Sequence, residues 1–224
     1  MNILALEFSS PVRSVAVARL DPAGVAVLGT AESAFDESDR QSSDALTLVD
    51  QALRAGGIDR AAIGAVVVGL GPGSYTGIRG AISLAQGWEL ATDARLLGIG
   101  SAEAIAAGAL SAGVQGRVGV VIDAQRGEFY LAGFELGTEV RASAPLRLAS
   151  AAEVAACRDS GALLVGPEVT RWFPEGRVIA PRAAALAALA AGRDGFVTGG
   201  QLEPIYLRTP QFVKAPPPRP LPTH

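Results

Sequence analysis

The chain has 224 residues, of which 49% are hydrophobic and 18% charged, with 22 acidic against 19 basic side chains. Its one histidine is His224 and its one lysine is Lys214. These counts exclude a histidine-based nucleophilic triad, a zinc protease with paired histidines and a lysine-containing Walker loop. The net charge of -3 argues against a chain whose main task is to grip nucleic acid.

Cysteine use and hydropathy predict a soluble cytoplasmic protein. Cys157 is the only cysteine, so no intramolecular disulfide can form, which is typical of a reducing compartment. The first residues carry no basic group and Glu7 interrupts their apolar run, unlike a signal peptide. The longest alanine and leucine run, 183–191, is far shorter than the roughly 20 residues of a membrane span.

The first half of the chain alternates short strands with helices. A turn at 9–11 joins the first two strands as a hairpin. Ser42 or Ser43 can cap the first helix, and Gly56 and Gly57 end it. The pattern predicts strands at 1–8, 12–20, 25–34, 65–69 and 95–99, and helices at 42–55, 73–91 and 101–110.

The second half begins like the first. An apolar strand ending at Asp123 folds back into a second strand, as the opening strand ending at Glu7 does, which suggests an internal duplication. Further elements are predicted as strands at 117–123, 128–135, 139–148 and 162–166 and helices at 151–158 and 181–192. Five prolines in the last nine residues predict a disordered tail, with a PxxP-type partner motif as the alternative.

The segment 66–80, VVVGLGPGSYTGIRG, is the best candidate for binding an anion or nucleotide. A buried strand leads through glycines to a helix N-terminus, where free N–H groups favour a phosphate or carboxylate. It matches neither the Rossmann nor the Walker pattern, and a plain turn capped by Ser74 is the competing interpretation. The candidate residues are Gly71, Gly73, Ser74, Thr76 and Gly77.

The helix that follows contains glycines, each costing about 1 kcal/mol relative to alanine. Small residues spaced by four and three along one side of a helix let another helix approach closely. The partner could be the helix at 42–55 or could belong to another protein. This seam comprises Gly73, Gly77, Gly80, Leu84, Gly87 and Ala91.

Two acids and several arginines are further candidates. Glu7 and Asp123, which end matching strands, could coordinate a nucleotide-bound magnesium ion or position a water, or could only cap turns. Most arginines must be solvated surface groups. Those that could meet a phosphate are Arg13, Arg40, Arg79 and Arg126.

Four segments together resemble the TsaB family, also called YeaZ, whose members are partner subunits in bacterial synthesis of tRNA threonylcarbamoyladenosine. They are ILALEFSS followed by SVAV, GLGPGSYTGIRGAISLAQGWELA, IDAQRGEFYLAGFE and PIYLR, within residues 2–208. The resemblance implies the α/β fold of actin-like, Hsp70-like and sugar-kinase-like (ASKHA) ATPases, with two duplicated lobes of mixed sheets flanked by helices. The expected division is an N-terminal lobe at 1–100 with partner-binding helices, a C-terminal lobe at 101–214, and a tail at 215–224.

The resemblance implies a supporting role. In that family TsaD holds the metal and transfers the threonylcarbamoyl group, while TsaB pairs with TsaD and with the ATPase TsaE. The contact between TsaB and TsaD is formed by the first two helices of the N-terminal lobe, which correspond here to 42–55 and 73–91. We therefore expect a non-catalytic scaffold or activator with no catalytic residue, metal or tightly bound cofactor. ATP or ADP would bind only in the complex, tRNA contact would be indirect, and the isolated chain would form a homodimer. The expected interface residues are Ala45, Leu48, Val49, Gly77, Gly80, Leu84, Gly87 and Trp88.

The chain departs from the family pattern at two places. Glu7 stands where the family commonly has aspartate, which weakens any inference of nucleotide contact there. Gln41 and Ser42 stand where the first long helix often begins with a histidine, and the missing histidine favours a non-catalytic interpretation. The alternative is a stand-alone ASKHA-type enzyme, either a small kinase or a glycoprotease-like peptidase. A kinase of this fold needs a complete ATP cleft and is usually longer.

Overall fold

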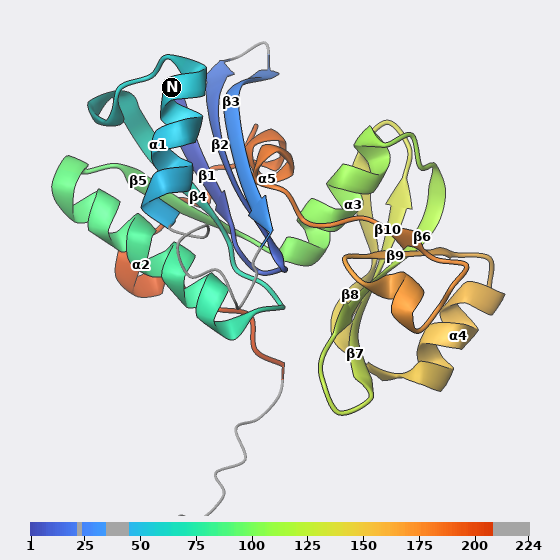
Figure 1. Cartoon of the computed structure of the whole chain (residues 1–224). Helices are drawn as coiled ribbons and strands as arrows, with labels where there is room; N and C mark the ends of the chain where they lie inside the picture. The colour runs from blue at the N-terminus through green and yellow to red at the C-terminus, as the bar shows by residue number, and fades with distance from the viewer. Residues whose placement is uncertain (22–23, 35–44, 208–224) are drawn as a thin grey trace, which may run out of the picture.

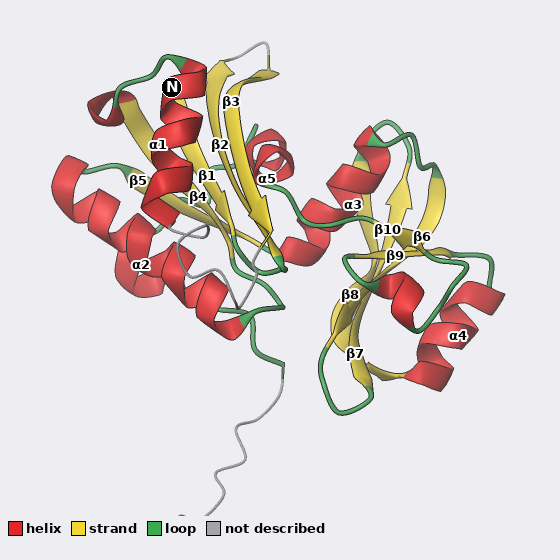
Figure 2. Ribbon diagram, viewed as in Figure 1, coloured by secondary structure: helices red, strands yellow, loops and turns green. Residues whose placement is uncertain are grey.

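The computed structural model describes residues 1–21, 24–34 and 45–207 (Figure 1). Two five-stranded mixed sheets form two lobes, each with helices on both faces (Figure 2). The strand orders are β3-β2-β1-β4-β5 and β10-β9-β6-β7-β8. Because the second order read backwards matches the first strand for strand, the duplication inferred from the paired hairpins is confirmed.

The first sheet is built around a central strand that is covered on both faces. β1 (Asn2–Glu7) pairs antiparallel with β2 (Val12–Asp21), which pairs with β3 (Gly24–Ala34). On its other side β1 lies parallel to β4 (Ile63–Gly69), which lies parallel to β5 (Arg95–Ile99). The continuous apolar run of β1 is typical of such a buried strand, with Leu4 and Leu6 in one core and Ile3 and Ala5 in the other.

Two helices cover the front face of this sheet. α1 (Ala45–Gly56) buries a single stripe that packs over β2 and β3. α2 (Tyr75–Thr92) packs on β4 and β5; Ser74 caps its start by accepting a hydrogen bond from the Gly77 N–H, and Asp93 ends it in a left-handed conformation. Both helices share one core with Leu4, Leu6, Val66 and Val68.

The back face is covered by a helix from the far end of the chain. α5 (Ala183–Leu189) packs against β1 and β2, and its first N–H donates to the buried Ser14 hydroxyl at 2.8 Å. α3 (Ser101–Ser111) lies beside α5 and contributes Ala104 to the same core. The opposite side of α3 packs through Ile105 and Ala106 on the second sheet, so this one helix belongs to both lobes.

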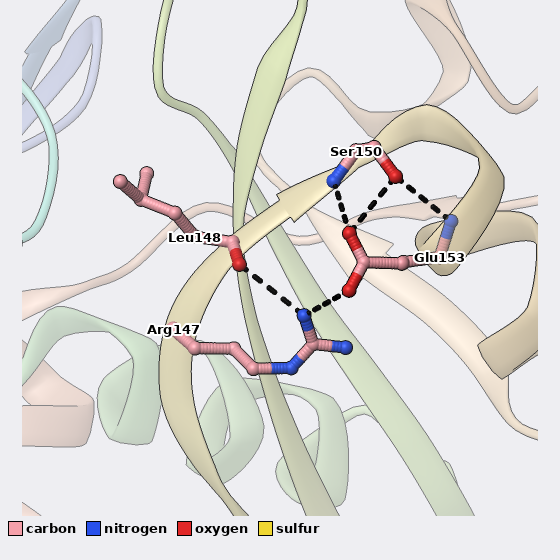
Figure 3. Close-up of polar contacts among 4 residues, drawn as sticks. All are labelled: Arg147, Leu148, Ser150 and Glu153. Atoms are coloured by element: carbon pink, nitrogen blue, oxygen red, sulfur yellow. Dashed lines mark hydrogen bonds and ion pairs between the residues drawn. The ribbon is translucent and has the colours of Figure 1, made fainter.

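The second sheet contains β6 (Gly116–Asp123), β7 (Glu128–Leu136), β8 (Val140–Ser150), β9 (Leu163–Gly166) and β10 (Arg177–Val178). α3 covers one face and α4 (Ala151–Asp159) the other. Ser150 and Glu153 form a capping box at the start of α4, and Arg147 donates to Glu153 at 2.6 Å (Figure 3). Short 3-10 turns occupy Arg60–Ala62, Val169–Arg171 and Gly199–Gln201.

The end of the described chain packs on the first sheet, although the predicted division assigns it to the C-terminal lobe. Beyond α5, residues 196–207, here called the C-terminal strap, run along the edge of the first sheet, where the Val197 N–H donates to the Leu96 carbonyl at 2.8 Å. Leu202 then enters the front core, and the Ile205 N–H donates to the Leu70 carbonyl at 2.9 Å. The first sheet therefore needs α5 to cover its back face and the C-terminal strap to cover its β5 edge.

The predicted elements agree with the structure apart from their ends. The last helix is shorter than the predicted 181–192, and the two-residue strand β10 escaped prediction because both of its residues are exposed. The proposed caps at 42–43 and the tail at 215–224 lie outside the described residues. No helix in the described part of the chain is long and apolar enough to cross a membrane.

Candidate functional site

Gly73, in the loop after β4, and Gly77, in the first turn of α2, let this turn lie against the turn between β1 and β2. A Cβ on Gly73 would lie 2.0 Å from the Ser9 carbonyl oxygen, and one on Gly77 would lie 2.0 Å from the Phe8 carbonyl oxygen. The Ser74 N–H donates to the Ser9 carbonyl at 2.7 Å. These glycines are needed because two backbone segments pass too closely for a side chain between them.

The protein itself uses the amides of Gly71 and Gly77. The Gly71 N–H donates to the Ser101 hydroxyl at 3.1 Å, and the Gly77 N–H donates to the Ser74 hydroxyl at 3.3 Å. Gly71 has a φ of +85°, and a Cβ there would lie 2.5 Å from Ile78 Cδ1. Both glycines are buried and their N–H groups are bonded within the fold, so this structure does not present these two amides to an anion.

The other three residues of the predicted loop, Gly73, Ser74 and Thr76, line a cleft of about 780 Å³ between the lobes. The first lobe contributes the β1–β2 turn and the start of α2, and the second contributes the β6–β7 turn with part of the loop after β9. The cleft is lined by Ser9, Ser10, Pro11, Arg13, Gly73, Ser74, Tyr75, Thr76, Ile122, Asp123, Ala124, Gln125, Tyr130, Pro167 and Glu168.

Glu7 is a structural carboxyl group outside this cleft. It is fully buried, and it accepts hydrogen bonds from the Ser9 N–H at 2.8 Å and the Ser101 hydroxyl at 2.9 Å. Burial raises the pKa of Glu7 above its ordinary value, because desolvation disfavours the charged form and outweighs the hydrogen bonds from Ser9 and Ser101. Its Oε2 lies so close to β4 that a Cβ on Gly69 would be 2.1 Å away. The turn-capping interpretation applies to Glu7.

Asp123 lines the cleft but is also committed to a turn, because its Oδ1 accepts a hydrogen bond from the Gln125 N–H at 2.8 Å. Within the described ranges no three histidine, cysteine or acidic side chains gather as a metal site. Of the two candidate carboxylates for a magnesium–nucleotide complex, Glu7 is fully buried against β4 and Asp123 accepts a hydrogen bond within a turn. The described residues of the cleft therefore do not fit a magnesium–nucleotide complex.

The candidate arginines lie apart. Arg13 lines the cleft, with its guanidinium 5.8 Å from the centre of the Phe8 ring. Arg126 belongs to the β6–β7 turn, with a φ of +59°. Arg79 lies on α2 outside the cleft lining, and Arg40 falls outside the described residues. Of the three candidate arginines within the described residues, the structure brings Arg13 to the cleft.

An exposed stripe of small residues runs along α2. Gly80 and Gly87 are exposed, and a Cβ on either would meet nothing within 4 Å. The stripe continues to the exposed Leu90 near the end of the helix, where 87% of the side chain is accessible. The residues of this surface, here called the helix stripe, are Thr76, Gly80, Ser83, Gly87 and Leu90.

Half of the predicted interface residues cannot contact a partner in this structure. Leu48, Val49 and Trp88 are buried in the front core, and Gly77 is buried against the Phe8 carbonyl. Ala45 and Leu84 are half-buried against that core. The predicted seam and the exposed stripe share Gly80 and Gly87 but diverge elsewhere. Small and apolar residues occupy both sides of α2, so their spacing alone does not tell the inward side from the outward side.

The structure adds a surface group that the sequence analysis missed. The rings of Tyr75 and Tyr206 stack with centres 5.5 Å apart and planes at 25°. The Arg79 guanidinium lies 4.5 Å from the centre of the Tyr75 ring, and its Nε donates to the Tyr206 hydroxyl at 3.4 Å. Tyr75 and Arg79 are four residues apart on α2, which predicts contact between them. Only the fold brings Tyr206 of the C-terminal strap to them. We call these three residues the tyrosine–arginine cluster.

The two lobes share one sheet topology and face each other across a cleft. This arrangement defines the ASKHA class of α/β proteins. The model of the family described as TsaD, tRNA N6-adenosine threonylcarbamoyltransferase, matches residues 36–193. The chain belongs to this family and, within it, to the TsaB (YeaZ) proteins.

Individual relatives agree with this assignment. The tRNA threonylcarbamoyladenosine biosynthesis protein TsaB of Escherichia coli K12 is 32% identical over 136 residues, which cover 60% of this chain and 55% of that protein. The chain thus matches about half the length of this relative. An uncharacterized protein of Mycobacterium tuberculosis H37Rv is 29% identical over 217 residues, covering 93% of this chain and 92% of its own.

Solved structures show the same fold. YeaZ from Pseudomonas aeruginosa superimposes with a TM-score of 0.75 at 26% identity, covering 92% of this chain and 99% of that chain. A second structure from that organism, described as an uncharacterized protein with similarity to peptidase YEAZ, gives a TM-score of 0.74 at 24% identity with the same coverage.

Proposed function

We propose that this chain is a non-catalytic scaffold or activator subunit that pairs with a TsaD-type protein, and with TsaE, in the threonylcarbamoylation of the adenosine next to the anticodon of tRNAs. The name of the Escherichia coli relative places that protein in tRNA threonylcarbamoyladenosine biosynthesis. The observation that carries the proposal for this chain is the exposed helix stripe on α2.

Among the described residues, no close contact requires glycine at the two glycine positions of the helix stripe. Gly73 and Gly77 allow a close backbone contact inside the protein, whereas a Cβ on Gly80 or Gly87 would enter open space. Glycine in a helix interior costs about 1 kcal/mol relative to alanine. Helices that pack together lie about 8 to 10 Å apart, and residues without side chains at the crossing permit the shorter distances. The two exposed glycines therefore support a partner helix outside the chain.

The chemistry of the cleft supports a role without catalysis. Glu7 is sealed in the core and Asp123 holds a turn, so neither carboxylate is positioned for phosphoryl transfer. We infer that ATP or ADP binds only in the complex with TsaD and TsaE and that tRNA contact is made through the partner in the cytoplasm. Without its partner, the chain would pair with a second copy through the same helix stripe.

The test is to titrate the purified chain with its cognate TsaD-type protein in a calorimeter. Gly80→Leu and Gly87→Leu place a branched side chain on the helix stripe, and each should weaken association by at least 100-fold. Gly137→Leu is the matched control, because this glycine also faces open space but lies in the turn between β7 and β8. The affinity of Gly137→Leu for the TsaD-type protein should stay within twofold of the wild-type value.

Absence of association between the wild-type chain and its cognate partner would refute the proposal. So would an unchanged affinity in both stripe variants. The competing assignment, a stand-alone kinase or peptidase, predicts ATP hydrolysis or proteolysis by the isolated chain with divalent metal. Such activity would have to survive rigorous purification and disappear in Asp123→Asn.

A further inference from the structure

We propose that the tyrosine–arginine cluster supplies most of the binding energy of the partner surface. In this proposal the cluster contacts the carboxyl end of a partner helix that lies antiparallel on α2. The inference rests on the proposed function, because it assumes that a TsaD-type protein docks on the helix stripe. It adds the residues that hold the partner, the direction of the partner's helix, and a role for the C-terminal strap, which lies outside the two helices expected to form the interface.

The cluster is exposed, yet it is held in place. Tyr75 is 55% accessible and Tyr206 is 43% accessible. The Ile205 N–H donates to the Leu70 carbonyl at 2.9 Å, immediately before Tyr206. Farther back along the strap, the Gly199 N–H donates to the Glu89 carboxylate of α2 at 2.9 Å. The strap is thus tied to α2 and β4, so a ligand of the rings would find them already ordered, which lowers the entropic cost of binding.

The N-terminal part of the helix stripe offers little area to a partner. Thr76, Gly80, Ser83 and Gly87 allow close approach but expose few atoms for burial, and the one large side chain of the stripe, Leu90, lies near the end of the helix. Interfaces draw most of their binding energy from a few residues, and tyrosine and arginine are prominent among them. Tyr75 and Arg79 directly precede Thr76 and Gly80 on α2. The large side chains therefore stand at the N-terminal end of the stripe, where they add the area that it lacks.

The charge of Arg79 indicates the direction of the bound helix. Its Nε is used by the Tyr206 hydroxyl, which leaves the four N–H groups of its two terminal nitrogens. Among the described residues, no acidic side chain forms a salt bridge with Arg79. The last carbonyls of a helix are unpaired acceptors at the negative end of its dipole. A helix antiparallel to α2 would bring this end to Arg79, whereas a parallel helix would bring its positive end.

The alternative is that the cluster only fastens the strap to α2. The two interpretations differ in what they predict for affinity and for stability. If the cluster only fastens the strap, Tyr206→Ala lowers the melting temperature and leaves partner affinity unchanged. If the cluster holds a partner, affinity falls even in variants whose melting temperature is unchanged.

The experiment is calorimetric titration of the full-length chain with its cognate full-length TsaD-type protein. Tyr206→Ala and Arg79→Gln should each raise Kd by at least tenfold, which corresponds to about 1.4 kcal/mol. Tyr206→Phe keeps the stacked ring but loses the hydroxyl acceptor, and its Kd should fall between those of wild type and Tyr206→Ala. The matched controls are Val178→Ala on β10 and Arg141→Gln on β8, both exposed in the second lobe. Their Kd should change less than twofold.

Salt provides a second readout for Arg79. Raising sodium chloride from 50 to 500 mM should weaken wild-type binding more than it weakens Arg79→Gln, because the screened attraction is absent in the variant. Equal salt dependence of the two proteins would overturn the proposed direction of the helix.

The outcomes separate this inference from the proposed function. If wild type does not bind the partner at all, the proposed function fails. Gly80→Leu could abolish binding while Tyr206→Ala and Arg79→Gln keep a Kd within twofold of wild type. In that case the proposed function stands, but the tyrosine–arginine cluster does not supply the binding energy and the inference is wrong. Should Tyr206→Ala fail to fold, Arg79→Gln decides, because Arg79 is an exposed side chain on a regular helix.

Discussion

Replacing the exposed glycines of α2 by alanine should make the protein more stable and less able to bind its partner. A Cβ at Gly80 or Gly87 meets nothing within 4 Å, and both positions have ordinary helical backbone, so alanine introduces no strain. Helix propensity predicts a gain of about 0.8 to 1 kcal/mol for each exchange. The sites lie two helical turns apart without a shared neighbour, so the gains should add to about 1.5 to 2 kcal/mol.

Urea denaturation followed by circular dichroism measures this gain, and a chain of this size should melt about 2 to 4 °C higher per kcal/mol. Gly77→Ala is the internal control, because its Cβ would lie 2.0 Å from the Phe8 carbonyl oxygen, and it should destabilise the protein. If Gly80→Ala and Gly87→Ala lower the free energy of unfolding, these glycines serve the fold and our reasoning about the helix stripe is wrong.

Three further predictions concern the fold. Hydrogen bonds from the Ser150 N–H and hydroxyl and from Arg147 lower the pKa of Glu153 from 4.5 to about 2 (Figure 3). The ionised Glu153 therefore stabilises the folded protein above pH 4.5, and this contribution is lost as the pH falls towards 2. In Glu153→Gln the free energy of unfolding, measured by urea denaturation, should fall less between pH 4.5 and 2 than it does in wild type. An equal pH dependence of the two proteins would contradict this prediction. Burial raises the pKa of Glu7, so its ionisation opposes folding increasingly as the pH rises above 4.5. Glu7→Gln should therefore gain stability relative to wild type as the pH rises from 4.5, and a difference that does not change with pH would contradict this. Leu202→Ala removes a buried side chain of the strap and should cost about 2 to 5 kcal/mol, whereas a loss below 0.5 kcal/mol would mean that the strap does not secure the front core.

The periodicity of the sequence predicts the elements well because each strand of the first sheet has a distinct pattern. The apolar run of β1 and the acid that ends it recur in β6, and this recurrence indicated the duplication before any fold was known. α5 was found as an alanine-rich helix, but such a helix packs equally well on either sheet. Its placement on the first lobe depends on long-range contacts, among them the hydrogen bond from its first N–H to the buried Ser14 hydroxyl.

The candidate site was predicted less completely. The glycine-rich loop looked like an anion site because its sequence cannot reveal that Gly73 and Gly77 lie against the carbonyls of Ser9 and Phe8. The resemblance implies an interface on the first two helices, but it does not tell which side of each helix faces outward, and apolar residues such as Leu48 and Trp88 face the core. Tyr206 carries no local indication of its partner Tyr75, because the two are brought together only when the strap crosses the sheet edge.

The return of α5 to the first lobe also bears on how the chain is made. During synthesis most of the back face of the first sheet stays uncovered until the whole second lobe has been translated, because α3 contributes only Ala104 to this core and the α5 residues that pack on Ile3 and Ala5 come later. The N-terminal half is then an incomplete nascent domain with exposed apolar surface, the condition under which chaperones are needed. A fragment cut at residue 100 would therefore leave Ile3 and Ala5 without the α5 residues that pack on them.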